Sequence, residues 1–381
     1  MEDMNMMPIN IERFTKLIRE QMEDEDYTPL LGLGKSGVGK TESIYGLTQE
    51  LGIGFCELRL VTMTETDMLG IPMINEHNRT DWASNNLLPD AKRDGERGIL
   101  VLDEITSCSS TIRAAAYQLL DSKRALGNYK LPEKWLVVGL GNAMGDGGVY
   151  QGLEQAFMNR CRCFRIDPDL AVWKRHAVKS GVNPSVIAFL SFAPEYLHHM
   201  DADEIASVFP SPRSWFSLSK KLNDRERRND GKPLDSDSVD IYAACCVGND
   251  VASRFAAFYN YNRSVVETED ILSGKASGKI ANLDMQVMYI IVQNLVKGIR
   301  TELKNNTTAD GSFTEQSKKR VGNACRWLIE LGSMSLDLAV MGLQDIGANV
   351  PEFQSCVMDA DFDDICPEFL EFATANSLIF S

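Results

Sequence analysis

A glycine-rich segment near the N-terminus carries the residues with the clearest chemistry. Residues 34–41 read Gly-Lys-Ser-Gly-Val-Gly-Lys-Thr and fit the pattern G-x-x-x-x-G-K-[ST] without a mismatch. Glycines let the backbone wrap tightly, so consecutive N–H groups point toward a phosphate, and a helix that starts there adds its positive dipole end. The context fits, because an apolar run (residues 30–33) precedes the segment and a helical pattern (residues 41–51) follows it. An ordinary glycine-rich turn, the alternative, would not require that order of elements.

This segment predicts a cradle for the phosphates of a nucleotide. We expect Lys40 to reach the β- and γ-phosphates of ATP and the Thr41 hydroxyl to bind Mg²⁺. The remaining residues expected to contact the nucleotide lie in the loop itself: Gly34, Ser36, Gly37, Val38 and Gly39.

Two carboxylates follow the next strong strand signal. The run Gly98–Leu102 is typical of a strand buried on both faces, and Asp103 and Glu104 come directly after it. Ligands bind at the carboxyl ends of strands in open α/β sheets. We therefore expect Asp103 to hold Mg²⁺ and Glu104 to be the general base that polarises the attacking water. Taken alone, such a run could simply be a strand leaving the core; downstream of a phosphate cradle it is far more specific.

A third apolar run, residues 135–141, ends at Asn142. An amide at the tip of this strand would position the lytic water against the γ-phosphate. Asn before a glycine-rich stretch (Gly145, Gly147 and Gly148) is also a common turn former, and that alternative stays open from the residue alone. The order cradle, carboxylate strand, amide-tipped strand favours the catalytic interpretation.

These side chains need a sheet to bring them together. Apolar runs alternate with helical patterns, such as residues 110–121, up to about residue 166, and this alternation predicts an α/β fold: a P-loop NTPase parallel sheet with flanking helices. From about Asp169 the strand signals fade, which predicts an all-α lid and a helical C-terminal extension. We expect an α/β nucleotide-binding domain at 1–168, a helical lid domain at 169–275 and an acidic helical extension at 276–381.

Together these motifs resemble the AAA+ superfamily, with Walker A at Gly34–Thr41, Walker B at Ile99–Glu104 and sensor 1 at Asn142. Softer motifs resemble the MoxR branch. Asp67-Met68-Leu69-Gly70 is similar to its segment after the second strand, and Ser211-Pro212-Arg213 to its sensor 2 motif at the start of a lid helix. The stretch 153–160 is similar to the helix that carries its arginine finger. The resemblance covers roughly residues 10–270.

The resemblance implies two arginines at the catalytic site and a ring. Arg213 would sense the nucleotide, in the first turn of a helix that Ser211 caps and Pro212 begins. Arg160 would be the finger, supplied in trans to stabilise charge on the γ-phosphoryl group, with Arg162 as its rival. A salt bridge holding the helix end is the alternative for either finger candidate. A finger in trans requires a closed homo-oligomeric ring, which the family implies is a hexamer.

Two segments depart from a minimal AAA+ core. Residues 71–92 form a polar region that we expect to be a loop, similar to the helix-2 insertion of the branch. Residues 120–134 are expected to form a hairpin before the strand that starts at Trp135. The resemblance places both near the pore as candidate substrate contacts, whereas ordinary surface loops are the alternative.

Charge and composition limit what the ring acts on. The formal net charge is −15, and residues 327–381 hold ten carboxylates and no Lys or Arg, so a phosphate backbone would be repelled. No run approaches the ~18 apolar residues of a membrane span. Nine scattered cysteines without a CxxC pair predict free thiols and a cytoplasmic protein. We expect a chaperone-like ATPase acting on a protein partner, which the resemblance implies has a von Willebrand factor A-type domain. The alternative is a motor or loader on nucleic acid, for which Lys123, Arg124 and Lys130 are the only hint.

Overall fold

The chain folds into two compact units. The computed structural model describes residues 6–83, 86–143, 146, 152–200, 208–230, 232–260, 268–276, 284–306, 312–359 and 361–376. One unit comprises Met1–Val172 with Met200–Ile205, and the other Trp173–His199 with Ala206–Ser381. The expected division of the helical part into a lid (169–275) and an extension (276–381) stays a prediction.

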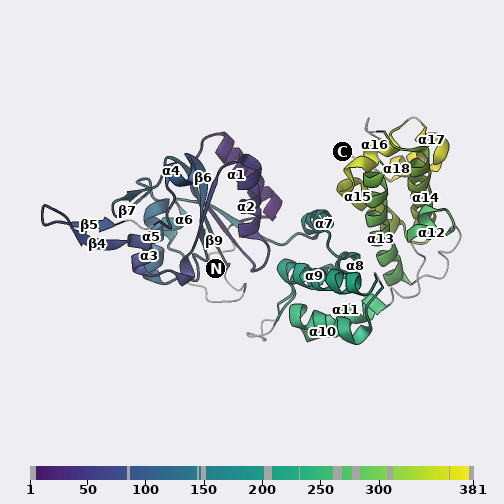
Figure 1. Cartoon of the computed structure of the whole chain (residues 1–381), viewed down its shortest axis with the longest axis horizontal. Helices are drawn as coiled ribbons and strands as arrows, with labels where there is room; N and C mark the ends of the chain where they lie inside the picture. The colour runs from purple at the N-terminus through teal and green to yellow at the C-terminus, as the bar shows by residue number, and fades with distance from the viewer. Residues whose placement is uncertain are drawn as a thin grey trace. The chain divides into compact units, whose positions relative to one another are not determined.

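The first unit is built on a parallel sheet of six strands (Figure 1). Its order is β1-β10-β2-β9-β6-β3, and every neighbouring pair is parallel. The strands are β1 (Met7–Ile9), β2 (Leu30–Gly34), β3 (Gly54–Arg59), β6 (Arg97–Asp103), β9 (Lys134–Gly141) and β10 (Arg162–Ile166). The sheet with flanking helices, followed by many helices, confirms the predicted fold class.

Helices cover both faces of the sheet, which explains the continuous apolar runs. Side chains alternate between two cores: Leu30 and Val101 face the core that includes Phe14 and Ile44, whereas Leu31 and Leu100 face the opposite core. The first of these cores lies under α1 (Ile11–Glu23) and α2 (Lys40–Leu51), and the second under α3 (Glu65–Leu69) and α5 (Ser110–Leu120) (Figure 1). Short elements complete the unit: η2 (Leu60–Thr62), α4 (Ala91–Asp94) and α6 (Gln155–Met158).

The two inserted segments are both hairpins. β7 (Ala125–Leu126) pairs antiparallel with β8 (Tyr129–Lys130), which confirms the predicted hairpin. The expectation of a loop at residues 71–92 was wrong, because β4 (Ile71–Ile74) and β5 (Thr80–Ala83) form a second antiparallel pair. All four residues of β4 are exposed, so no alternation of inward and outward side chains marks the strand in the sequence.

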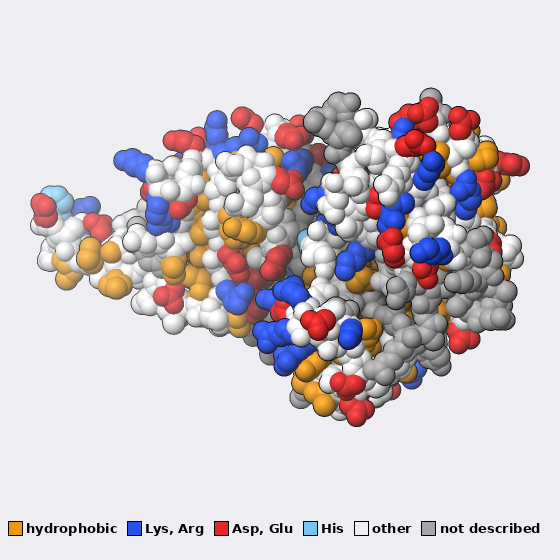
Figure 2. Space-filling model, turned by 45° about the vertical axis from the view of Figure 1, so that its right-hand side comes forward, with side chains coloured by type: hydrophobic (Ala, Val, Ile, Leu, Met, Phe, Trp, Pro, Cys, Tyr) orange, Lys and Arg blue, Asp and Glu red, His pale blue; other side chains and the backbone are white. Residues whose placement is uncertain are grey.

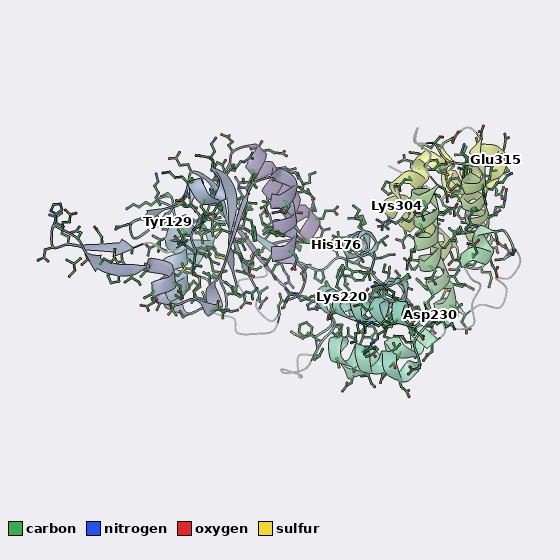
Figure 3. The ribbon with its side chains drawn as sticks, viewed as in Figure 1. Tyr129, His176, Lys220, Asp230, Lys304 and Glu315 are labelled. Carbon is green, nitrogen blue, oxygen red and sulfur yellow. The ribbon has the colours of Figure 1, made fainter. Side chains whose placement is uncertain are left out.

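The two hairpins touch each other. A Cβ built on Gly127, at the β7–β8 turn, would meet the Trp82 side chain of β5 at 3.8 Å. Tyr129, labelled in Figure 3, donates its hydroxyl to the carbonyl of Pro89 at 2.7 Å, and burial raises the pKa of that hydroxyl. The insertions therefore form one continuous region of the first unit.

The elements described beyond β10 are all helical. They are α7 (Leu170–Lys179), α8 (Pro184–Phe192), η3 (Pro194–Leu197), α9 (Pro212–Arg228), α10 (Ser236–Val247), α11 (Asn249–Asn260), α12 (Thr268–Leu272), α13 (Met285–Asn305), α14 (Glu315–Gly332), α15 (Leu336–Asn349), α16 (Pro351–Val357), α17 (Phe362–Ile365) and α18 (Glu368–Ala375). Helices α12–α18 share a large apolar core. Among the described helices, none combines the length and the apolar character that a membrane crossing requires.

Basic residues of α14 meet the acidic C-terminal stretch. The Lys318 ammonium lies 2.5 Å from the carboxylate of Asp359 and 3.7 Å from that of Asp361, and Arg326 lies 3.0 Å from that of Glu368. The hydrogen bond to Asp359 raises the pKa of Lys318. Part of the acidic charge of the C-terminal stretch is therefore compensated within the second unit.

Candidate functional site

The strand order gathers the predicted site at one edge of the sheet. Because all the strands are parallel, the carboxyl ends of β2, β9 and β6 lie side by side, with β9 in the middle. β2 ends at Gly34, β6 ends at Asp103, and Asn142 follows the end of β9. The cradle, the carboxylates and the amide thus share the edge where open α/β sheets bind ligands.

The cradle has the backbone that its glycines predict. Gly37 and Gly39 have φ angles of 78° and 93°, which L side chains rarely adopt, and α2 begins at Lys40 directly after them. The Lys40 ammonium donates to the carbonyls of Gly34 (2.7 Å) and Lys35 (3.0 Å), so it lies over the loop. The loop and the helix N-terminus together are suited to bind phosphates.

The cradle and the carboxylate strand meet at a pair of oxygens. The Thr41 hydroxyl, in the first turn of α2, donates to the Asp103 carboxylate at 3.1 Å. Hydroxyl and carboxylate oxygens are the ligands that Mg²⁺ prefers. The donor set therefore fits the metal that was predicted at Thr41 and Asp103.

Glu104 has an unusual backbone conformation. Its φ angle is 57°, in the left-handed region that few non-glycine residues adopt. Two hydrogen bonds hold it there: its N–H donates to the Asp103 carboxylate, and the N–H of Ser107 donates to its carbonyl, each at 2.9 Å. The chain turns immediately after β6, and Glu104, whose side chain is half-buried, is the first residue of that turn.

Asn142 lies directly beyond β9, and its backbone N–H donates to the hydroxyl of Thr106 at 3.0 Å. Its side chain is half-buried. The glycines Gly145, Gly147 and Gly148 lie outside the described residues, so the alternative of a plain turn former is not decided there. Thr106 was missed by the sequence reasoning, because nothing in the run after Glu104 signals a contact with a residue 36 positions away.

A further carboxylate near the cradle, Asp146, was also missed. Asp146 exposes 7 % of its surface, and its Oδ2 has no hydrogen-bond partner among the described residues. Burial raises the pKa of this carboxyl, while the charges of Arg165, Lys35 and Lys40 act in the opposite direction. A lone Asp within a glycine-rich stretch gives no sign of burial in the sequence.

The two candidates for the arginine finger both form ion pairs, at different distances. Arg160, just after α6, lies 3.5 Å from the Asp121 carboxylate and leaves 51 % of its side chain exposed. Arg162, at the start of β10, lies 2.7 Å from the Asp26 carboxylate. Hydrogen bonds from Thr28, and then Arg162, lower the pKa of Asp26. Arg160 is the less tightly held of the two, which favours it as the mobile donor.

Arg213 belongs to the second unit. Ser211 caps α9 through a reciprocal pair of hydrogen bonds with Ser214, and Pro212 is the first helical residue, as the sequence predicted. The Arg213 side chain is exposed in the first turn. Its contact with a nucleotide stays a prediction.

The basic residues that hinted at nucleic acid are partly committed to the fold. Arg124 donates to the carbonyls of Glu133 (2.9 Å) and Trp135, and its guanidinium lies 5.8 Å from the centre of the Tyr27 ring. Burial lowers the pKa of Arg124. Lys130 lies 3.8 Å from the Glu133 carboxylate. Arg124 is thus a structural residue of the hairpin.

Comparisons with known proteins give one family match and two distant structural likenesses. Residues 29–161 match the family model of the AAA domain, dynein-related subfamily. A RuvB mutant from Thermotoga maritima aligns at a TM-score of 0.37 and 13 % identity over 82 % of this chain and 94 % of its own. A closed-state reconstruction of Hsp104 with ATPγS and FITC-casein aligns at a TM-score of 0.34 and 16 % identity, over 56 % of this chain and 41 % of its own. No curated protein matches the sequence.

Proposed function

We propose that the AAA domain at residues 29–161 makes this chain an ATPase, which uses Mg²⁺-bound ATP to remodel a protein partner from within a homo-oligomeric ring. The observation that carries the proposal is the contact of Thr41 with Asp103, at the edge where Glu104 and Asn142 also lie. A degenerate nucleotide-binding scaffold would not need to keep all four of these residues.

Each residue of the edge has a distinct role in this proposal. The cradle and Lys40 bind and orient the phosphates. Thr41 and Asp103 would hold Mg²⁺, which would neutralise charge on the phosphates. Glu104 accepts a proton from the attacking water, and the Asn142 amide orients that water. Arg213, in the first turn of α9, would be the nucleotide sensor.

The proposal predicts a separation of binding from turnover. Glu104→Gln keeps the size of the side chain and removes the base, so it should bind ATP while phosphate release slows by about 10²-fold or more. Glu96→Gln is the matched control, because Glu96 is an exposed glutamate just before the same strand. Hydrolysis by Glu104→Gln at the control rate would remove Glu104 from the mechanism.

We further propose that Arg160 acts in trans, so that each catalytic site combines residues of two neighbouring subunits. Arg160→Ala should abolish hydrolysis and spare ATP binding, whereas Arg162→Ala should lose mainly the ion pair with Asp26. Mixing Arg160→Ala with Lys40→Ala subunits restores some intact sites if the finger comes from a neighbour. If no mixture regains activity, the finger does not act in trans.

The β4–β5 hairpin supports a protein as the substrate. Ile71, Met73 and Ile74 expose 62 %, 55 % and 77 % of their surface, and Figure 2 shows hydrophobic side chains along this hairpin. Within the described part of the chain β4 and β5 pair only with each other. An exposed apolar strand edge of this kind binds extended polypeptide well and has little to offer a phosphate backbone. In the MoxR-like interpretation this partner carries a von Willebrand factor A-type domain.

The partner class is tested with the trapped Glu104→Gln ring. In the presence of ATP it should retain a protein partner, and Met73→Lys in the hairpin should weaken that retention without changing basal ATPase activity. Salt-dependent DNA binding by the purified ring is the opposing measurement. If DNA raises the ATPase rate and the retained protein does not, the chain is a nucleic-acid motor instead.

A further inference from the structure

We infer that Thr106 is a positioning residue for hydrolysis, because it ties the turn that carries Glu104 to the end of the strand that carries Asn142. The inference rests on the proposed ATPase function and adds a residue that the motifs do not contain. Thr106 itself would touch neither the nucleotide nor the water.

Thr106 has no contact with solvent. Its exposed fraction is 0 %, and its hydroxyl oxygen accepts the backbone N–H of Asn142 at 3.0 Å. The residue before it, Ile105, donates its N–H to the carbonyl of Leu140 at 2.9 Å. Two consecutive residues of the turn are therefore bonded to the end of β9 at Leu140 and to Asn142 just beyond it, past the last paired residues of the strands, Leu102 and Gly139.

The turn leaves Glu104 little freedom. Glu104 has a left-handed φ angle, and the N–H of Ser107 closes the turn on the Glu104 carbonyl at 2.9 Å. Residues 105 and 106 are then held on β9. The base and the amide consequently keep a fixed spacing, although they come from different strands.

Gly141 makes room for this contact. A Cβ at this position would lie 2.6 Å from the Thr106 hydroxyl oxygen and 2.9 Å from its methyl carbon. Only glycine therefore lets the Thr106 side chain reach the Asn142 N–H in the observed arrangement. The bond can be broken from either side, by changing Thr106 or by filling the space at Gly141.

A buried threonine that only satisfies a backbone N–H is the simpler interpretation. It predicts a loss of stability when the hydroxyl is removed, with no specific effect on turnover. Thr48 provides that comparison within the same unit: it is also 0 % exposed, and its hydroxyl donates to the Tyr45 carbonyl at 2.7 Å on α2. Thr48→Val therefore reports what a merely structural hydroxyl contributes.

The experiment measures ATP affinity, kcat and thermal unfolding for the whole 381-residue chain. Thr106→Val keeps the shape and removes the hydroxyl, and we expect kcat to fall by about 10- to 10²-fold with the Kd for ATP unchanged, because small misplacements of catalytic groups have effects of this size. Thr106→Ser should restore most of the rate. Gly141→Ala should reproduce the loss. Thr48→Val should leave kcat unchanged.

A double-mutant cycle separates positioning from an independent effect. In the Asn142→Ala background, Thr106→Val should lower kcat little further, since one of the two groups whose spacing it sets is already gone. Equal losses in both backgrounds, or wild-type kcat in Thr106→Val, would overturn the inference. If Thr106→Val does not fold, Thr106→Ala takes its place in the cycle.

The same assay distinguishes a failure of the proposed ATPase function from a failure of the role assigned to Thr106. A wild-type chain that binds ATP without hydrolysing it defeats the proposed function, and the role of Thr106 falls with it. A wild-type chain that hydrolyses ATP while Thr106→Val matches it defeats only the role of Thr106.

Discussion

The left-handed conformation of Glu104 predicts that this residue, the proposed general base, reduces the stability of the folded protein. We consider two replacements that both remove the carboxylate, Glu104→Ala and Glu104→Gly. They differ only in the Cβ atom, so side-chain contacts and charge cancel in the comparison. At an ordinary helical position glycine is the less stable of the two, but a φ angle of 57° should reverse the order.

The magnitude follows from two opposing contributions. An L residue in the left-handed region is disfavoured by about 1–2 kcal/mol relative to its usual conformations. Glycine avoids this penalty but loses about 0.5–1 kcal/mol more in chain entropy on folding. The difference leaves Glu104→Gly more stable than Glu104→Ala by about 0.5–1 kcal/mol, which is a rise of about 1–4 °C in the unfolding temperature of a domain of this size.

Calorimetry of the two variants, with phosphate release measured alongside, provides the test. Both variants should have lost hydrolysis. The control is Ala114→Gly, because Ala114 is an exposed residue within α5. There glycine should destabilise the protein by about 1 kcal/mol. If Glu104→Gly unfolds at or below the temperature of Glu104→Ala, the backbone strain assigned to the base does not exist.

Three further predictions concern the surroundings of the site and the cores. Gly98→Ala should lower the free energy of unfolding by about 1–3 kcal/mol, because its Cβ would lie 2.6 Å from the Trp135 ring; Trp135→Leu should cost less in that background than alone. Burial raises the pKa of Asp146. The protonated carboxyl therefore contributes its stability in full below the ordinary pKa of a carboxyl, and this contribution is lost as the pH rises through the raised pKa of Asp146. Asp146→Asn should therefore raise the unfolding temperature at pH 7, and the gain should shrink toward about pH 4; a gain independent of pH would contradict this. Among the nine free thiols, the exposed Cys245 should react first with a thiol reagent, and the fully buried Cys325 only after unfolding, which labelling followed by mass spectrometry resolves.

The sequence predicts the cradle and the carboxylates well, because each motif depends on local geometry. The φ angles of the loop at positions 37 and 39 favour glycine, and a continuous apolar run is typical of a strand covered on both faces. Once the strands are parallel, their carboxyl ends must share an edge, so the neighbourhood of Asp103 and Asn142 follows from the fold class alone.

The residues that the sequence did not predict depend on contacts between distant positions. Thr106 acquires its partner only when β6 and β9 lie side by side, and no periodic pattern records a single hydroxyl pointing at a backbone N–H. The β4–β5 hairpin was missed for a different reason. Its strand Ile71–Ile74 is exposed along its whole length and contains Pro72, so it lacks the alternation by which a half-buried strand is recognised.

The hairpins and the catalytic edge belong to one connected stretch of chain. The turn after Glu104 leads through α5 to the β7–β8 hairpin, which contacts Trp82 of β5 at Gly127 and Pro89 through the Tyr129 hydroxyl. At its start this segment is bonded to the end of β9, through the N–H of Ile105 and the hydroxyl of Thr106. Proximity alone does not establish coupling. The connection still gives the proposed site and the hairpins a physical link, because the segment that begins at the turn after Glu104 continues through α5 to a hairpin that lies against Trp82 and Pro89.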